Sequence, residues 1–182
     1  MSAKPVLRAL LALLLLSGTT TGGAAGPWYT VELLFFASED VASRQSQSLR
    51  TRQPLPDTTL ATPLSLGSDQ VQSLGPDSHN LAGVWQELRV SGQYRPLRHV
   101  AWRQVGTSAS RAPVVRLGDD PAASVYGTVK MVRTRFLHLH LDLLVDDGEG
   151  QYLLRERRKM SPGELHYFDH PSVGVLARVT RG

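Results

Sequence analysis

The sequence predicts an α+β domain built mainly on an antiparallel sheet of about five to six strands. Three features indicate this class: an apolar strand segment early in the domain, one amphipathic helix segment, and a later series of alternating segments joined by short turns. We expect a single domain over residues 26–182, with a flexible polar loop over about residues 38–80.

Residues 1–25 have the three parts of a cleavable secretory signal peptide: a basic start, an apolar run over residues 9–16, and a stretch of small residues that reaches Ala25. The apolar run is shorter than the about 20 residues that cross a membrane. An uncleaved N-terminal anchor is the alternative. We expect cleavage after Ala25, export to the periplasm of a Gram-negative cell, and no membrane span in the mature chain.

The composition excludes several classes of protein. The chain has no cysteine, so neither a disulfide nor a lipidated cysteine is available. Its formal net charge is +4, which is too mild for a nucleic-acid-binding surface. No phosphate loop, dinucleotide fingerprint or nucleophile motif occurs in the sequence. These observations favour a non-enzyme that uses no cofactor.

The first elements follow from hydrophobic periodicity. Trp28 to Ala37 is rich in aromatic and apolar residues on both faces, which predicts a central strand. The polar stretch that follows keeps no period in its scattered leucines, and we expect a long loop there. A helix is predicted over about residues 79–90, capped by Ser78, with Ser91-Gly92 at its end. Its apolar face is formed by Leu81, Val84, Trp85 and Leu88.

The second half of the chain predicts an antiparallel meander. The Asp-Gly turn over residues 146–150 indicates a hairpin, and a tighter turn is expected at residues 133–135. A last short strand is predicted from the alternating valines after residue 172. The four other strand candidates are Leu97 to Gln104, Ser124 to Arg133, Arg135 to Asp146 and Tyr152 to Met160.

His138, His140 and Asp142 would point to one face of a strand, because side chains alternate along it. Two imidazoles and a carboxylate form a set that binds zinc, as in the His-x-His-x-Asp motif of metallo-β-lactamase-like hydrolases. Here Leu143 occupies the place of that motif's further histidine. The alternative is the polar face of an amphipathic strand whose leucines enter the core.

A second histidine-rich segment runs from His166 through Asp169 to His170. A helix is doubtful there, because Pro162-Gly163 precedes the segment and Pro171 follows it. Metal binding or acid-base catalysis is one interpretation. Local hydrogen bonds that hold a turn are the other.

Arginine and aromatic residues alternate around the predicted strand Leu97 to Gln104, where Trp85 and Tyr94 precede a run of arginines. Aromatic faces can stack on sugar rings, and guanidinium groups can pair with carboxylates. The tryptophans could equally lie in the core. We predict a ligand-binding site at Arg95, Arg98, Trp102 and Arg103.

Longer motifs resemble the CsiV family of exported peptidoglycan-binding proteins. The motifs are Trp85-Gln-Glu-Leu, the run from Gly92 to Gln104, the run from Arg135 to Asp142, Arg157 to Ser161, and Glu164 to Pro171 followed by Gly174-Val-Leu. The resemblance implies a periplasmic accessory protein that supports cell-wall synthesis and cell division through the lipoprotein LpoA and a class A penicillin-binding protein. It assigns no residue to peptidoglycan contact.

Three functions remain open at this point. The first is a non-catalytic module that binds peptidoglycan. The second is a zinc-dependent periplasmic hydrolase that uses His138, His140 and Asp142. The third is an adaptor that binds a protein partner through the long polar loop.

Overall fold

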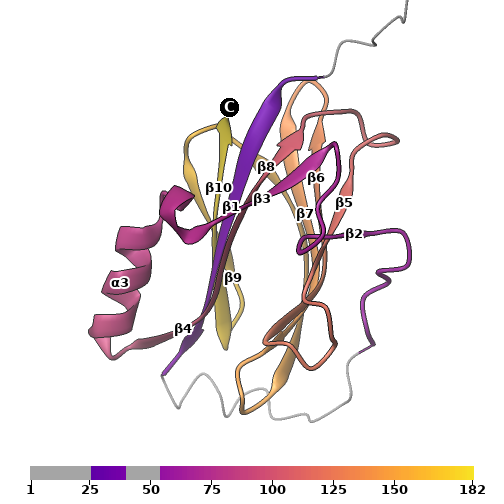
Figure 1. Cartoon of the computed structure of the whole chain (residues 1–182). Coiled ribbons are helices and arrows are strands. Elements are labelled where there is room, and N and C mark those ends of the chain that lie inside the picture. The colour runs from indigo at the N-terminus through magenta and orange to yellow at the C-terminus, as the bar shows by residue number, and fades with distance from the viewer. Residues whose placement is uncertain (1–25, 40–53) are drawn as a thin grey trace, which may run out of the picture.

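The computed structural model describes residues 26–39 and 54–182. Within them the chain forms two five-stranded sheets that face each other as a β-sandwich, with one short α-helix outside (Figure 1). The predicted antiparallel pairing is confirmed. The fold is mostly β and not clearly α+β, and its strands divide between two sheets rather than forming one sheet of five to six strands. The signal peptide and residues 40–53 of the polar loop lie outside the described residues.

The first sheet has the strand order β3-β4-β1-β10-β9, and every neighbouring pair is antiparallel. β1 lies in its middle, as its apolar character on both faces predicts. β10 is also an inner strand, although its sequence suggested a short closing strand. The bounds are β1 Trp28–Ser38, β3 Val71–Leu74, β4 Tyr94–Val105, β9 Leu165–Asp169 and β10 Val173–Arg181.

The second sheet has the order β2-β5-β6-β7-β8. From β5 to β8 it is the expected meander, and the β7–β8 hairpin closes at the Asp-Gly turn, where Asp146 pairs with Gln151. The short β2 pairs with β5 in parallel. The bounds are β2 Thr62–Pro63, β5 Val114–Leu117, β6 Val125–Arg133, β7 Leu137–Asp146 and β8 Gln151–Met160.

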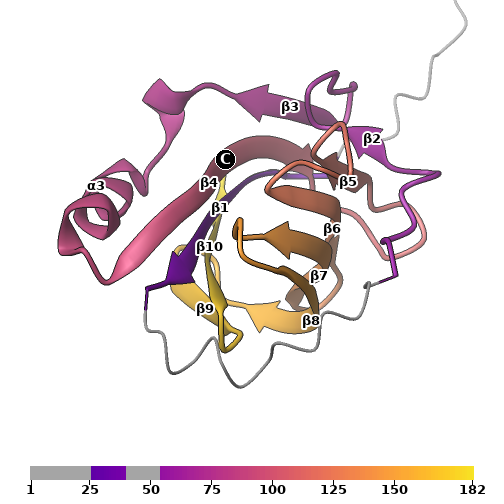
Figure 2. The same ribbon diagram turned by 90° about the horizontal axis from the view of Figure 1, so that it is seen from below.

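The main core fills the space between the sheets, which face each other in Figure 2. Alternate side chains of β1 and β7 enter it from opposite sides, and most of them are fully buried. Each buried aliphatic side chain of this kind stabilises the fold by roughly 1.5–3 kcal/mol. Typical members are Val31, Leu33, Phe35, Leu139, Leu141 and Leu143.

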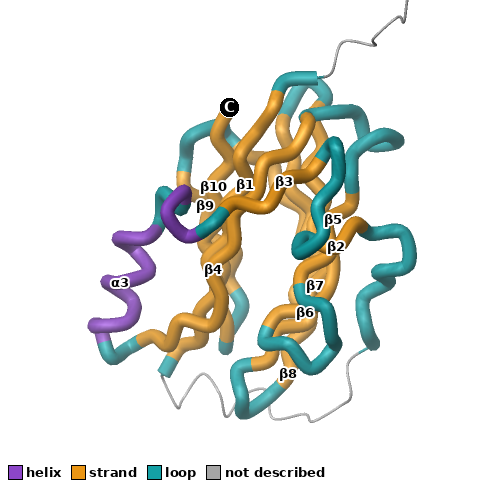
Figure 3. The backbone as a smooth tube through the Cα atoms, viewed as in Figure 1, coloured by secondary structure: helices purple, strands orange, loops and turns teal. Residues whose placement is uncertain are grey.

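The helix α3 (Ala82–Ser91) packs on the outer face of the first sheet (Figure 3). Its predicted apolar face is confirmed, because Val84, Trp85 and Leu88 cover Leu34 and Phe36 of β1. This second cluster explains why β1 is apolar on both faces. No helix in the described parts of the chain is long and apolar enough to cross a membrane.

The ends of α3 are closed in different ways. At its C-terminus Gly92 adopts the left-handed conformation with φ 67°, as expected for a helix-ending glycine. At its start the predicted Ser78 cap is wrong, because Ser78 belongs to the 3-10 helix η2 (Pro76–Ser78). The Glu32 carboxylate of β1 instead accepts the backbone N–H groups of Asn80 at 3.1 Å and Leu81 at 2.8 Å. A carboxylate is favoured at this positive helix end.

The polar stretch before α3 is more ordered than a featureless loop. Its described part, residues 54–80, contains β2, β3 and η2, and β3 extends the first sheet through its pairing with β4. The leucines that showed no period differ in burial. Leu64 is buried in the main core, whereas Leu60 and Leu66 are exposed.

Candidate functional site

β7 presents two chemically different faces. Its leucines point into the core, while His138, His140 and Asp142 lie on the outer face of the second sheet. This arrangement confirms the amphipathic pattern of the strand. The outer face is where these polar side chains can meet a ligand.

Pairing between the strands continues this polar face on both sides of β7. His140 lies opposite Lys130 of β6 and opposite Arg157 of β8, so three basic residue types form one row across three strands. Directly opposed side chains on one face of a sheet are neighbours. We call this surface the basic face; its members are Lys130, His138, His140, Asp142, Arg155, Arg157 and Lys159.

The carboxylate of Asp142 forms an ion pair with an arginine. Arg155 donates from Nε and Nη2 to Oδ1 of Asp142 at 3.1 and 3.0 Å, and from Nη2 to Oδ2 at 3.3 Å. Among the described residues, neither Lys130 nor Arg157 has an acidic partner within ion-pair distance. Lys130 and Arg157 of the basic face are therefore not neutralised by any acidic side chain of the described residues.

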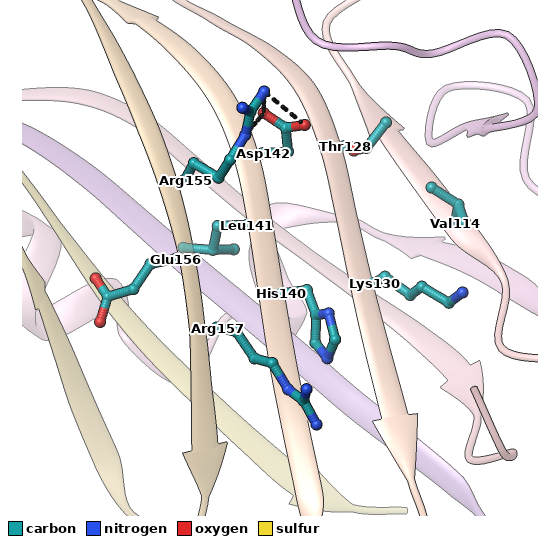
Figure 4. Close-up of a pocket in the computed structure, with 9 residues that line it drawn as sticks. All are labelled: Val114, Thr128, Lys130, His140, Leu141, Asp142, Arg155, Glu156 and Arg157. Atoms are coloured by element: carbon teal, nitrogen blue, oxygen red, sulfur yellow. Dashed lines mark hydrogen bonds and ion pairs between the residues drawn. The ribbon is translucent and has the colours of Figure 1, made fainter.

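A pocket of about 390 Å³ lies on this face and is formed by strands β5 to β8. Figure 4 shows the side chains of Lys130, His140 and Arg157 along it, with the Asp142–Arg155 pair at one end. The lining residues are Val114, Thr128, Lys130, His140, Leu141, Asp142, Arg155, Glu156 and Arg157.

The surroundings of the pocket change the pKa of His140. Burial, together with the positive charge of Arg157, His138 and Lys130, lowers the pKa of His140 below its ordinary value. Its Nε2 atom is buried and has no hydrogen-bond partner among the described residues. At neutral pH the ring is uncharged, so the positive charge of the row comes from Lys130 and Arg157.

This arrangement suits an anion better than a cation. Lys130 and Arg157 can pair with a carboxylate, and an arginine can do so through two parallel hydrogen bonds. The predicted zinc set of His138, His140 and Asp142 faces two obstacles: Asp142 is held by Arg155, and cations surround His140. The geometry therefore counts against that hydrolase, which stays a prediction.

Comparison with known proteins identifies the family. A family model described as "Peptidoglycan-binding protein, CsiV" matches residues 7–182. The chain belongs to the CsiV family. No curated protein and no solved structure matches it.

In this CsiV-family chain, the four residues predicted to bind a ligand do not share one surface. Trp102 is fully buried, and its Nε1–H donates to Oε1 of Gln104 at 2.7 Å. The guanidinium of Arg103 lies 5.4 Å from the ring centre of Trp28. Since Trp102 has no exposed surface to offer, its burial counts against this site, which stays a prediction.

Arg95 and Arg98 instead connect the two sheets. Nη1 of Arg98 donates to the backbone carbonyl of Val125 at 3.1 Å, and Nη2 of Arg95 donates to that of Asp147. Arg95 also pairs with Glu39 at 3.1 Å. Burial lowers the pKa of Arg98, although nearby Asp119 opposes the shift. These contacts give both arginines structural roles.

The other predicted residues have local roles. Trp85 stacks on His99 with ring centres 5.6 Å apart, and Tyr94 meets Phe36 edge to face. The segment of His166 and His170 forms β9 and the turn after it, which the sequence did not predict as a strand. Nε2 of His166 accepts the N–H of Ser161, and Nδ1 of His170 accepts that of Ser172.

Sequence reasoning missed the basic face as a unit. The run from Arg155 to Lys159 was visible, but its members alternate between the faces of β8. Arg157 joins Lys130 only through the pairing of β8 with β7 and of β7 with β6. The sequence did contain one signal for this face. Basic residues stand at every second position of strands that the predicted Asp-Gly turn joins into a hairpin.

Proposed function

We propose that this protein binds peptidoglycan without catalysing a reaction, and that the basic face contacts the peptide stems. The description of its family supports the ligand class. Peptidoglycan stems carry carboxylates, which are the groups that paired lysine and arginine side chains recognise.

The observation that carries the contact site is the row Lys130, His140 and Arg157 across three strands. A sheet holds such a row rigidly, so little ordering entropy is lost when a ligand binds. The row opens into a pocket, and its two cations lack acidic partners among the described residues. A carboxylate placed between them would make two charge-assisted contacts.

The proposal has a cellular part as well. A protein that binds the cell wall must be exported, so we propose a periplasmic location reached through the signal peptide at residues 1–25. We further propose that wall binding supports cell-wall synthesis and cell division through the lipoprotein LpoA and a class A penicillin-binding protein. These partners rest on the family resemblance.

The test is co-sedimentation of the purified protein with peptidoglycan sacculi. The double variant Lys130→Gln/Arg157→Gln removes both cations and leaves shorter, uncharged polar side chains. Two charge-assisted hydrogen bonds contribute about 1.5–3 kcal/mol each. We therefore expect the dissociation constant to rise at least about tenfold. Circular dichroism and the melting temperature check that the fold is unchanged.

Arg89→Gln is the matched control, because Arg89 is an exposed arginine on α3, outside the basic face. It should bind sacculi like the unmodified protein. Arg103→Gln tests the site predicted from sequence. Failure of the unmodified protein to sediment would overturn the proposed function. Loss with Arg103→Gln but not with the double variant would move the contact to β4.

A further inference from the structure

A second cluster of ligand-type side chains lies beneath the start of α3, away from the basic face. It consists of Glu32 on β1, His79 in the segment before α3, and His99 on β4. One potential ligand atom from each residue lies within 4.8 Å of the other two. The side chains of Glu32 and His99 are only 2% and 8% exposed.

His79 presents a buried ring nitrogen that nothing in the described residues uses. Its Nε2 has no hydrogen-bond partner among them, and its ring centre lies 4.2 Å from that of His99. An uncharged imidazole nitrogen that is free of a hydrogen bond can serve as a metal ligand. Burial, with a further contribution from His99, lowers the pKa of His79, so its ring stays neutral.

The other two ligands are already held in place. Nε2 of His99 and Oε1 of Glu32 are 2.8 Å apart, and Trp85 stacks on the His99 ring. The backbone N–H groups of Asn80 and Leu81 donate to the Glu32 carboxylate. Burial opposes ionisation of Glu32, but the hydrogen bond with His99, followed by those from Leu81 and Asn80, outweighs it and lowers the pKa of the carboxyl group. Without metal, Nε2–H of His99 donates to the Glu32 carboxylate, and an ion bound between them would take the place of this proton.

We propose that Glu32, His79 and His99 bind a divalent transition-metal ion of the zinc type. Two imidazole nitrogens and one carboxylate oxygen are ligands that zinc prefers, and three protein ligands leave a fourth position open. The ion would tie the segment before α3 to β1 and β4. This site is independent of the proposed peptidoglycan contact, and among the described residues no arginine pairs with its carboxylate, in contrast to Asp142.

The test is a calorimetric titration of the purified, chelator-treated full chain with Zn²⁺ as the only metal. We expect one equivalent to bind, and Co²⁺ to give the visible absorption of a tetrahedral site. His79→Gln should weaken binding at least tenfold. His140→Gln is the matched control, because it removes a histidine of the set predicted from sequence, and it should bind normally.

Thermal unfolding separates binding from folding defects. His79→Gln removes the contact of the His79 ring with His99, whose ring centre lies 4.2 Å away, so each protein is compared with itself, with and without metal. Zn²⁺ should raise the melting temperature of the unmodified protein and not that of the variant. Absence of stoichiometric binding, or equal binding by His79→Gln, would overturn the site. Loss of binding in His140→Gln alone would also overturn it.

Discussion

A single glycine determines how closely β6 can approach β7. Gly127 has φ 135°, a conformation that side-chain-bearing residues rarely adopt. A Cβ atom there would lie 2.3 Å from the backbone oxygen of Asp142 and 2.9 Å from Cγ of Pro56. The smallest residue is therefore required in the strand next to the basic face.

Gly127→Ala should lower the free energy of unfolding by at least about 1–3 kcal/mol, because the backbone of β7 has to move. Gly83→Ala is the paired control. Apart from its own helix, no atom of the described residues lies within 4 Å of the position of its Cβ, and it is in α3, where alanine is favoured. It should stabilise the protein by about 0.4–1 kcal/mol. Urea unfolding of both variants measures these changes, and equal stability of the two would contradict the argument.

His140 should make stability depend on pH. Its pKa is lowered in the folded protein, so the unfolded chain binds this proton more readily and stability falls as the pH drops below about 6.5. Above that pH the contribution is fully present. The groups that face the ring are Lys130, His138 and Arg157.

The comparison is between the unmodified protein and His140→Gln, by urea unfolding at pH 7.5 and at pH 5.5. The stability of the unmodified protein relative to the variant should decrease at the lower pH. A relative stability that stays constant, or increases, would show that the surrounding cations do not disfavour protonation of this ring.

At the scale of elements, the sequence predicted those helices and strands that have a clear periodicity or turn residues of their own. β1, α3 and the β7–β8 hairpin each have their own periodicity or turn residues, and the structure contains all three. β5 and β9 were missed, because they have four and five residues and little alternation. β9 is a strand through its pairing with β10, a contact that its own sequence does not encode.

The candidate sites were predicted only as far as each strand's own sequence allows. The outward face of β7 was predictable, but its neighbours Lys130 and Arg157 depend on pairing across strands. Glu32 gave a signal that could have been used: an acidic residue inside a strand expected to be central needs a buried partner. His79 and His99 gave none, because their spacing fits no known motif and the fold alone brings them together.

At the scale of the molecule, alternation predicts which residues face a core but not how many sheets share it. The inner faces of both sheets have the same apolar pattern, so one sheet and two sheets look alike in the sequence. The outer faces differ. α3 covers part of the first sheet, whereas the second presents the basic face. The sandwich thereby separates two chemical surfaces.

That separation predicts how binding responds to salt. The formal net charge of the chain is only +4, so attraction to an anionic wall must come from local cations rather than from the whole molecule. Charges on an exposed sheet face are screened within about 10 Å at 0.1 M salt. Binding to sacculi should therefore weaken steadily between about 0.05 and 0.5 M NaCl.

The slope of log Kd against log salt concentration tests which cations of the protein contact the wall. It should be clearly smaller for Lys130→Gln/Arg157→Gln than for the unmodified protein, because fewer ionic contacts remain to be screened. Arg89→Gln should keep the original slope, since it removes one positive charge from the helix side of the sandwich. Equal slopes for all three proteins would mean that the basic face makes no ionic contact with the wall. Binding that salt does not weaken would instead indicate stacking and neutral hydrogen bonds.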